Sequence, residues 1–320
     1  MTSSSELLAT IQVLMEPTSV AIAPDGSRAY VTLEEFHSDG IRGGVASIDT
    51  RTNTVIATIA LGHPSGVVIA PDGRRAYVPN WDSRHGRGVV SVIDTGTNGV
   101  IDSITVSGRG GGPKGVVITL DGRRAYVATD QEVDGPEGHA RVSVIDTEAN
   151  AVIARIVVRP FPAGAAIRPD GRFVYMLDTE GDPAVIDTAS QERTFPFGTT
   201  PNGHRMAFTP DGRLAYMIRD SDTQIFVIDV ATSGLHQLLE ASGLTTDVAV
   251  TPDGRFVYLT QRTAHQISVL ETGVVMVPTH PVAWSGTADG IAMMPDGLTA
   301  YVSDRRSRAV RVIPVGPQTA

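Results

Sequence analysis

The chain has 320 residues, of which 41% are apolar and 19% charged, and its formal net charge is −9. This composition is typical of a soluble globular protein, and the acidic balance argues against a nucleic-acid backbone as the main partner. There are no cysteines, which excludes disulfides, thiolate–zinc sites, iron–sulfur clusters and cysteine nucleophiles. No apolar run approaches the roughly 18 residues of a membrane span. The N-terminus lacks the features of a signal peptide, so we expect a cytoplasmic protein.

A turn motif recurs along the whole chain. Pro-Asp-Gly occurs six times, and Leu120-Asp121-Gly122 supplies a seventh member, at spacings of 41 to 49 residues. A tyrosine follows each of these glycines by four positions, and together they are all the tyrosines of the chain: Tyr30, Tyr77, Tyr126, Tyr175, Tyr216, Tyr258 and Tyr301. A period of this length predicts repeated supersecondary units within one fold.

Each unit is expected to form four short strands. In the second unit these are residues 67–70, 75–78, 89–93 and 100–106, with Asp72-Gly73 as a tight positive-φ turn between the first two. The last unit has only three strand-like segments, and residues 7–13 resemble an outer strand, so they are expected to complete that unit. The predicted fold is an all-β, seven-bladed β-propeller with four antiparallel strands per blade, whose last blade is closed by the N-terminal strand. We expect one domain over residues 1–320, with 1–6 as a disordered tail.

The run Pro71–Val78, with Val-Ser-Val-Ile-Asp-Thr at 90–95 and the outer strand at 55–60, resembles the YVTN-type β-propeller repeat. The resemblance covers nearly the whole chain and implies the same fold. Relatives of this repeat include surface-layer proteins, periplasmic binding propellers, lactonase-like hydrolases and assorted biosynthetic enzymes. No catalytic residue is carried over, so the function has to be argued from the site.

Candidate functional residues are those that depart from the repeat. In a propeller, the loops between blades and those between the second and third strands lie on one face, and seven of the eight histidines fall in these loops. They include His63, His85, His139, His204 and His265. Both tryptophans, Trp81 and Trp284, and Phe36 map to the same face. Six residues before each turn triplet lies a position at the mouth of the channel, which holds the single lysine, Lys114, and also Asp289.

Two chemistries fit these residues. His63, His204, His85, His139 and His265 could bind a divalent metal ion that polarises a carbonyl or activates water. Alternatively, His204, His139 or His85 could act with a carboxylate, such as Asp82 or Asp178, as a metal-free acid–base pair. Lys114 would anchor an anionic group or act as a base, and Trp81, Trp284, Phe36 and Asp289 would contact the substrate. The remaining interpretation is that these histidines only face water. No nucleotide or flavin motif is present.

The sequence therefore predicts a small-molecule enzyme, either a hydrolase or a lyase acting on an ester, a lactone or a related activated carbonyl. The alternative is a non-catalytic propeller that uses the same loop face to bind a peptide or protein partner. A small-molecule substrate at the channel mouth, no membrane or nucleic-acid partner and a monomeric state are expected.

Overall fold

A computed structural model describes residues 7–37, 40–130, 140–158, 161–196, 202–219, 222–264, 266–272 and 282–316. Within these ranges the regular structure consists of strands, with no helix. None of the described residues belongs to a helix that is long and apolar enough to cross a membrane. The chain forms two compact units, one made of Met1–Leu33, Ala46–Ala57 and Ala207–Ala320, the other of Glu34–Val45 and Thr58–Met206.

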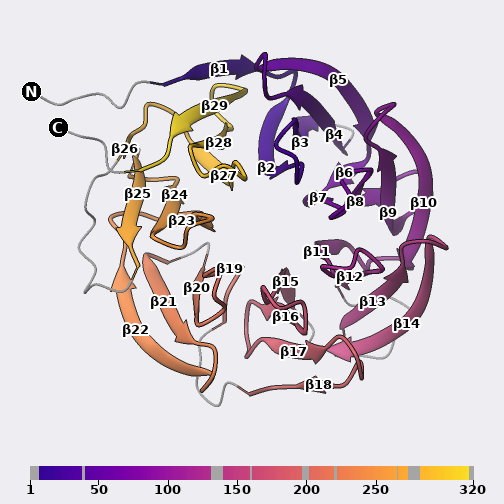
Figure 1. Ribbon diagram of the computed structural model, residues 1–320. Helices are drawn as coiled ribbons and strands as arrows, with labels where there is room; N and C mark the ends of the chain where they lie inside the picture. The colour runs from indigo at the N-terminus through magenta and orange to yellow at the C-terminus, as the bar shows by residue number, and fades with distance from the viewer. Residues whose placement is uncertain are drawn as a thin grey trace, which may run out of the picture. The chain divides into compact units, whose positions relative to one another are not determined.

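The strands form seven antiparallel sheets, numbered here as blades 1 to 7 in chain order (Figure 1). Blade 1 contains β2 (Glu16–Ile22), β3 (Arg28–His37), β4 (Gly40–Asp49) and β5 (Thr54–Leu61). Blade 2 contains β6 (His63–Pro64), β7 (Val68–Ile69), β8 (Arg75–Asp82), β9 (Arg87–Asp94) and β10 (Gly99–Ser107). Blade 3 contains β11 (Pro113–Ile118), β12 (Arg124–Thr129), β13 (Ala140–Asp146) and β14 (Ala151–Val158). Blade 4 contains β15 (Pro162–Ile167), β16 (Phe173–Asp178), β17 (Ala184–Asp187) and β18 (Arg193–Thr194).

The second half of the chain continues the pattern. Blade 5 contains β19 (Arg205–Phe208), β20 (Leu214–Ile218), β21 (Gln224–Asp229) and β22 (Gly234–Glu240). Blade 6 contains β23 (Thr245–Val250), β24 (Phe256–Gln261), β25 (Gln266–Glu271) and β26 (Val282–Ala283). Blade 7 contains β27 (Ala288–Met293), β28 (Thr299–Asp304), β29 (Ala309–Pro314) and, at its outer edge, β1 (Ala9–Gln12). Blade 2 differs from the four-strand pattern only because its inner strand is split into β6 and β7, both of which pair with β8.

Blade 7 is completed by the N-terminal strand, as the sequence predicted. β1 pairs antiparallel with β29, with Ala9 opposite Val312 and Gln12 opposite Ala309 (Figure 1). Ile11 and Val312 then belong to one buried cluster with residues of blade 1, including Val31. The two ends of the chain are thus joined by a β-ladder, which protects an edge that would otherwise be open. The expectation of one domain over residues 1–320 stays a prediction, and residues 1–6 lie outside the described residues.

The recurring aspartates and glycines build the turns. In all seven turns the aspartate carboxylate accepts the backbone N–H two residues later, as in the bond from Ser27 to Asp25 (2.9 Å). The seven glycines have φ between 69° and 72°, a conformation that costs glycine little. Only the glycine is left-handed, and its N–H reaches the carbonyl three residues earlier, as from Gly26 to Ala23 (2.8 Å). The expected tight turn at Asp-Gly is therefore a turn of four residues that ends at the glycine, as Ala23 to Gly26 does.

The seven tyrosines pack within the blade layers. Six are 2% exposed or less and Tyr175 is 4% exposed. Tyr301 of blade 7 donates to the Asn53 side chain (2.6 Å) and lies 3.3 Å from the Thr50 carbonyl, both in the blade 1 turn between β4 and β5. Tyr77 of blade 2 likewise reaches the Thr147 carbonyl in blade 3 (3.3 Å). These contacts make the tyrosines structural residues of the repeat.

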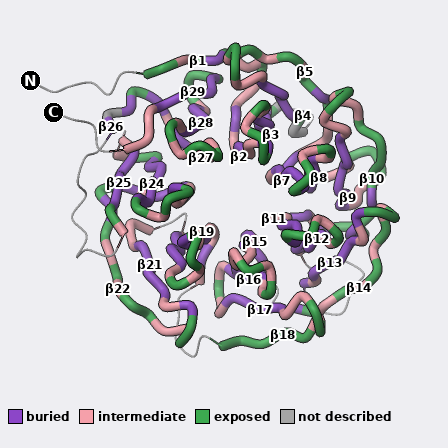
Figure 2. Tube along the Cα trace, viewed as in Figure 1, coloured by how far each residue is buried: buried purple, intermediate pink, exposed green. Residues whose placement is uncertain are grey.

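Burial separates the second strand of each of these blades from the outer one. The outer strands β5 and β14 alternate between exposed and partly buried residues, whereas β8 and β12 are almost wholly buried (Figure 2). Inner strands of neighbouring blades approach so closely that a Cβ on Gly164 would lie 2.4 Å from the His204 carbonyl oxygen. The backbone of β15 therefore lies directly against His204, the residue before β19.

Candidate functional site

Three of the predicted site residues line one small pocket. His63, Trp81 and Lys114 line a pocket of about 260 Å³ with Ser65, Gly110, Gly112, Pro113 and Asp130. All eight belong to the unit that contains Thr58–Met206. They come from the inner edge of blades 2 and 3 and from the glycine-rich loop that joins β10 to β11. We name it the His63–Lys114 pocket.

Local backbone contacts hold the walls of the His63–Lys114 pocket. His63 in β6 pairs with Trp81 in β8, so the two side chains start from facing positions of one ladder. The glycine-rich loop is tied on both sides: the Asp130 N–H donates to the Gly112 carbonyl (3.0 Å), and the Ser107 hydroxyl donates to the Gly111 carbonyl. A short loop held in this way brings Lys114, the second residue of β11, against the end of β12.

His63 is paired with a carboxylate. Its Nε2 lies 3.0 Å from Oε1 of Glu34 in β3, and the side chains are 39% and 12% exposed respectively. When the imidazole is neutral, this bond fixes the proton on Nε2 and leaves the lone pair on Nδ1. A histidine oriented by a carboxylate is the arrangement used by general bases.

Lys114 is paired as well. Its Nζ lies 3.0 Å from Oδ2 of Asp130, the residue that directly follows β12. Burial raises the pKa of the Asp130 carboxyl, and the hydrogen bond from Lys114 acts in the opposite direction. Asp289, the residue at the equivalent repeat position, is not the partner of Lys114 in these ion pairs, because it binds two arginines.

His85 and His204 lie outside this pocket's lining. His85 follows β8, is 63% exposed, and has Nδ1 2.6 Å from Oδ2 of Asp82. That hydrogen bond is the main reason why the pKa of Asp82 is lowered. His204 immediately precedes β19 and is half-buried, and its carbonyl lies against Gly164. His139 and His265 lie outside the described residues.

Three predicted substrate-binding residues have other surroundings. Trp284 is 3% exposed and packs in a core cluster with Ile267 and Val302, under the guanidinium of Arg311 (4.9 Å). Asp289 is bound by Arg262 (2.9 Å) and Arg305 (3.4 Å). Phe36, near the end of β3, is 63% exposed. Their roles in binding stay predictions, and the buried Trp284 has little surface to offer a ligand.

The sequence reasoning missed Glu34 and Asp130. A signal for both was present, because each lies four residues after its repeat tyrosine, as do Trp81, Arg262 and Arg305. All five residues make site or ion-pair contacts. Aligning the repeats four residues after the tyrosine would have shown a position whose residue type changes from blade to blade.

The described histidines do not form a metal cluster. Across the described ranges, no group of three or more His, Asp or Glu side chains is placed to hold a metal ion. His63 and His85 each contact a carboxylate, but in separate pairs. The metal site stays a prediction, because His139 and His265, two of its five ligands, lie outside the described residues.

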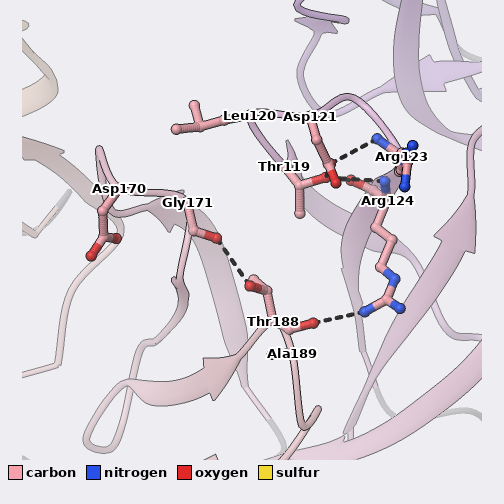
Figure 3. A pocket seen from close by; sticks show the side chains of 9 residues that line it. All are labelled: Thr119, Leu120, Asp121, Arg123, Arg124, Asp170, Gly171, Thr188 and Ala189. Atoms are coloured by element: carbon pink, nitrogen blue, oxygen red, sulfur yellow. Dashed lines mark hydrogen bonds between the residues drawn. The ribbon is translucent and has the colours of Figure 1, made fainter.

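Other hollows lie beside the recurring turns. One of about 430 Å³ separates blades 3 and 4 and is lined by Thr119, Asp121, Arg124 and Asp170, among others (Figure 3). Hydrogen bonds in its wall connect blades 3 and 4: the Arg124 guanidinium donates to the Thr188 carbonyl (2.7 Å), and the Thr188 hydroxyl donates to the Gly171 carbonyl (3.0 Å). Arg75 makes the equivalent bond to Thr147 (2.6 Å) beside a similar hollow of about 300 Å³. Because the repeat produces these hollows, they do not indicate a specific site.

Comparison with known proteins identifies the family. The chain matches the family described as Lactonase, 7-bladed beta-propeller over residues 49–320, and it belongs to that family. Its seven sheets are therefore the seven blades of a β-propeller, as the repeat predicted. The YVTN label itself stays a prediction.

A solved structure supports the same fold. A chain of Kuenenia stuttgartiensis hydrazine synthase is 23% identical, with a TM-score of 0.76 over 95% of this chain and 97% of that chain. At this identity the likeness concerns the fold alone. A search of the curated proteins finds no match.

Proposed function

We propose that the protein is a hydrolase that opens a lactone or a related ester in the His63–Lys114 pocket. The observation that carries this proposal is the pairing of His63 with Glu34 on the wall of a pocket that also holds the single lysine. The family description, which names lactonases, supports the reaction class. Trp81 and Pro113 supply apolar surface for the ring of the substrate.

The roles of the residues follow from their chemistry. Nδ1 of His63 takes a proton from a water molecule as the water oxygen attacks the carbonyl carbon of the lactone. The Lys114 ammonium, oriented by Asp130, donates to the carbonyl oxygen and stabilises the negative charge that develops on it. The ring C–O bond then breaks, and the imidazolium of His63 returns its proton to the leaving alkoxide. The product is a hydroxy acid, whose carboxyl group ionises to a carboxylate and releases its proton to the solvent.

The two carboxylates have different tasks in this scheme. Glu34 accepts the Nε2–H of His63, holds the productive tautomer and stabilises the imidazolium that forms during the attack. Asp130 holds Lys114 against the pocket wall. The metal-assisted version stays a separate prediction, which elemental analysis of the protein purified without a chelator or affinity tag would test.

The proposal is tested by measuring proton release from a panel of γ- and δ-lactones by pH-stat titration. General acid–base groups contribute roughly 10²–10⁴-fold in rate, so His63→Gln and Glu34→Gln are expected to lower kcat by at least about 100-fold. His236→Gln is the matched control, because His236 lies on the outer strand β22 and outside the His63–Lys114 pocket. Unchanged turnover in His63→Gln, or no lactone turned over by the wild type, would overturn the proposal.

A further inference from the structure

The hollow between blades 5 and 6 is lined by three carboxylates. It has a volume of about 490 Å³, and its residues belong to the unit that contains Ala207–Ala320. We name it the Leu214 hollow, and its lining includes Asp211, Arg213, Leu214, Asp229, His236, Asp253 and Thr272. One arginine and one histidine therefore line it together with three acidic side chains.

The repeat places a leucine here where two other blades have an arginine. Arg124, two residues after its turn glycine, donates to the carbonyl of Thr188, the residue that follows the third strand of the next blade (2.7 Å, Figure 3). Arg75 makes the same bond one blade earlier (2.6 Å). Leu214 has the same place after its turn glycine, and the corresponding threonine is Thr272. Because leucine has no donor, the chain supplies no guanidinium at this position.

A buried hydroxyl beside the Leu214 hollow lacks the contact that its repeat equivalent makes. Tyr216 is 0% exposed, and its hydroxyl has no hydrogen-bond partner among the described residues. The equivalent hydroxyl of Tyr77 lies 3.3 Å from the Thr147 carbonyl. Burial and the negative charge of Asp211 both raise the pKa of Tyr216, which places its hydroxyl on the side of this lining carboxylate. A phenolic oxygen can accept a hydrogen bond from a cationic donor.

The three carboxylates each use one oxygen for their own turn. Oδ1 of Asp211, Asp229 and Asp253 accepts a backbone N–H from two or three residues later (2.9–3.0 Å). All their hydrogen bonds to described residues end on Oδ1, which leaves Oδ2 for a ligand that donates. Among the described side chains no group is placed to hold a metal ion, which favours a larger cation. Guanidinium has five N–H donors in one plane and pairs well with carboxylates.

In three other blades the protein itself provides the contact at this level. Phe173 of blade 4 lies under the guanidinium of Arg168 (4.5 Å). The Tyr258 hydroxyl of blade 6 accepts the Gly316 N–H (2.9 Å), and Tyr301 of blade 7 donates to a side chain of blade 1 (2.6 Å). The repeat alone therefore does not account for the Leu214 hollow.

We propose that the Leu214 hollow binds a guanidinium group, supplied by a small guanidine or by an arginine side chain of a peptide. The guanidinium takes the place that Arg124 has in blade 3: it donates to Oδ2 of the carboxylates and to the Thr272 carbonyl, and the Tyr216 hydroxyl accepts from it. This hollow shares no residue with the His63–Lys114 pocket, so the proposal is independent of the hydrolase activity.

The test compares cations with uncharged molecules of the same shape. n-Butylguanidinium and n-butylurea differ in charge and in one donor group, as do N-acetyl-Gly-Arg-Gly amide and its citrulline counterpart. Ligand-observed NMR titration is expected to show that each guanidinium compound binds at least about tenfold more tightly than its urea partner. Raising the salt concentration from about 20 to about 200 mM should weaken this binding. Tighter binding of the peptide assigns the site to an arginine of a partner, and tighter binding of n-butylguanidinium assigns it to a small guanidine.

Variants of the hollow test where the guanidinium binds. Leu214→Arg supplies the missing guanidinium from the chain, as in blades 2 and 3, and should weaken binding of n-butylguanidinium by at least about tenfold. Leu214→Met, an uncharged substitution of similar volume, should keep the affinity within about twofold. Asp211→Asn keeps the oxygen that accepts in the turn but removes the charge, and should weaken binding by about threefold. Its matched control is Asp296→Asn, which changes the equivalent turn of blade 7 outside the hollow.

Two results would overturn the proposal. One is equal binding of the guanidinium compounds and their urea partners to the wild-type protein. The other is an affinity for n-butylguanidinium that Asp211→Asn changes no more than Asp296→Asn does. Asp211→Asn decides the question also if Leu214→Arg does not fold, which thermal unfolding of each variant would show.

Discussion

Two tyrosines at the same repeat position, Tyr301 and Tyr216, allow the contribution of one buried hydrogen bond to stability to be measured. Tyr216 is 0% and Tyr301 2% exposed, and burial is the main cause that raises the pKa of each to about 12. The Tyr301 hydroxyl donates to Asn53 (2.6 Å), whereas the Tyr216 hydroxyl has no hydrogen-bond partner among the described residues. Replacing each by phenylalanine removes the same atom from nearly the same environment.

The two substitutions are expected to change the free energy of unfolding by different amounts and in different directions. Tyr301→Phe breaks a hydrogen bond and leaves the Asn53 oxygen without its donor, which should lower the free energy of unfolding by about 1–2 kcal/mol. Tyr216→Phe removes a buried hydroxyl that is not satisfied, so it should leave stability unchanged or raise it by up to about 1 kcal/mol. The difference between the variants is about 2 kcal/mol.

Equilibrium urea unfolding followed by tryptophan fluorescence measures this difference. Both variants keep the phenyl ring, so the packing contribution cancels and the midpoints report on the hydroxyl. Equal midpoints for Tyr301→Phe and Tyr216→Phe would refute the reasoning, because the loss would then reflect burial of the ring position and not the hydrogen bond.

Three further predictions concern pH and packing. Because the pKa values of Tyr216 and Tyr301 are raised to about 12, the stability that these groups contribute is complete below pH about 10 and is lost between about 10 and 12; tyrosinate absorbance should therefore rise together with unfolding. The backbone N–H groups of Ser27 and Thr52 lower the pKa values of Asp25 and Asp49, and backbone N–H groups likewise lower those of Asp94, Asp187 and Asp229, so stability is lost as the pH falls below about 4. A urea midpoint that is the same at pH about 6 and about 3 would contradict this. Gly164→Ala would place a Cβ 2.4 Å from the His204 carbonyl oxygen and should lower the free energy of unfolding by about 1–3 kcal/mol. Gly66→Ala would place a Cβ with no atom within 4 Å and should lower it by less than about 0.5 kcal/mol. Thermal unfolding of the two variants would measure this difference.

The fold was predictable because its determinants are local and repeated. The aspartate of each turn bonds to a backbone N–H only two residues away, and the glycine supplies the one left-handed residue that the turn needs. Seven copies of this signal, together with seven tyrosines at a fixed offset, exclude most other architectures. Even the pairing of β1 with β29 could be inferred, since the last unit lacks a strand and residues 7–13 have the pattern of the missing one.

The site was predictable only in part. The sequence indicated His63, Trp81 and Lys114 as departures from the repeat, and the structure brings these three into one pocket. It also indicated Trp284, whose side chain is buried in the core, and Asp289, which is bound by two arginines. A one-dimensional pattern gives the face of the molecule on which a residue starts, but not the neighbour that its side chain meets.

The sequence alone determined the repeat, the strands, the turns and the closure of blade 7, because each depends on contacts close in the chain or on a recurring period. Only the tertiary structure decided that Glu34 lies beside His63 and Asp130 beside Lys114. These partners are 29 and 16 positions apart in the sequence, so their contact depends on how neighbouring strands and blades pack. The two ion pairs beside the pocket follow from that packing.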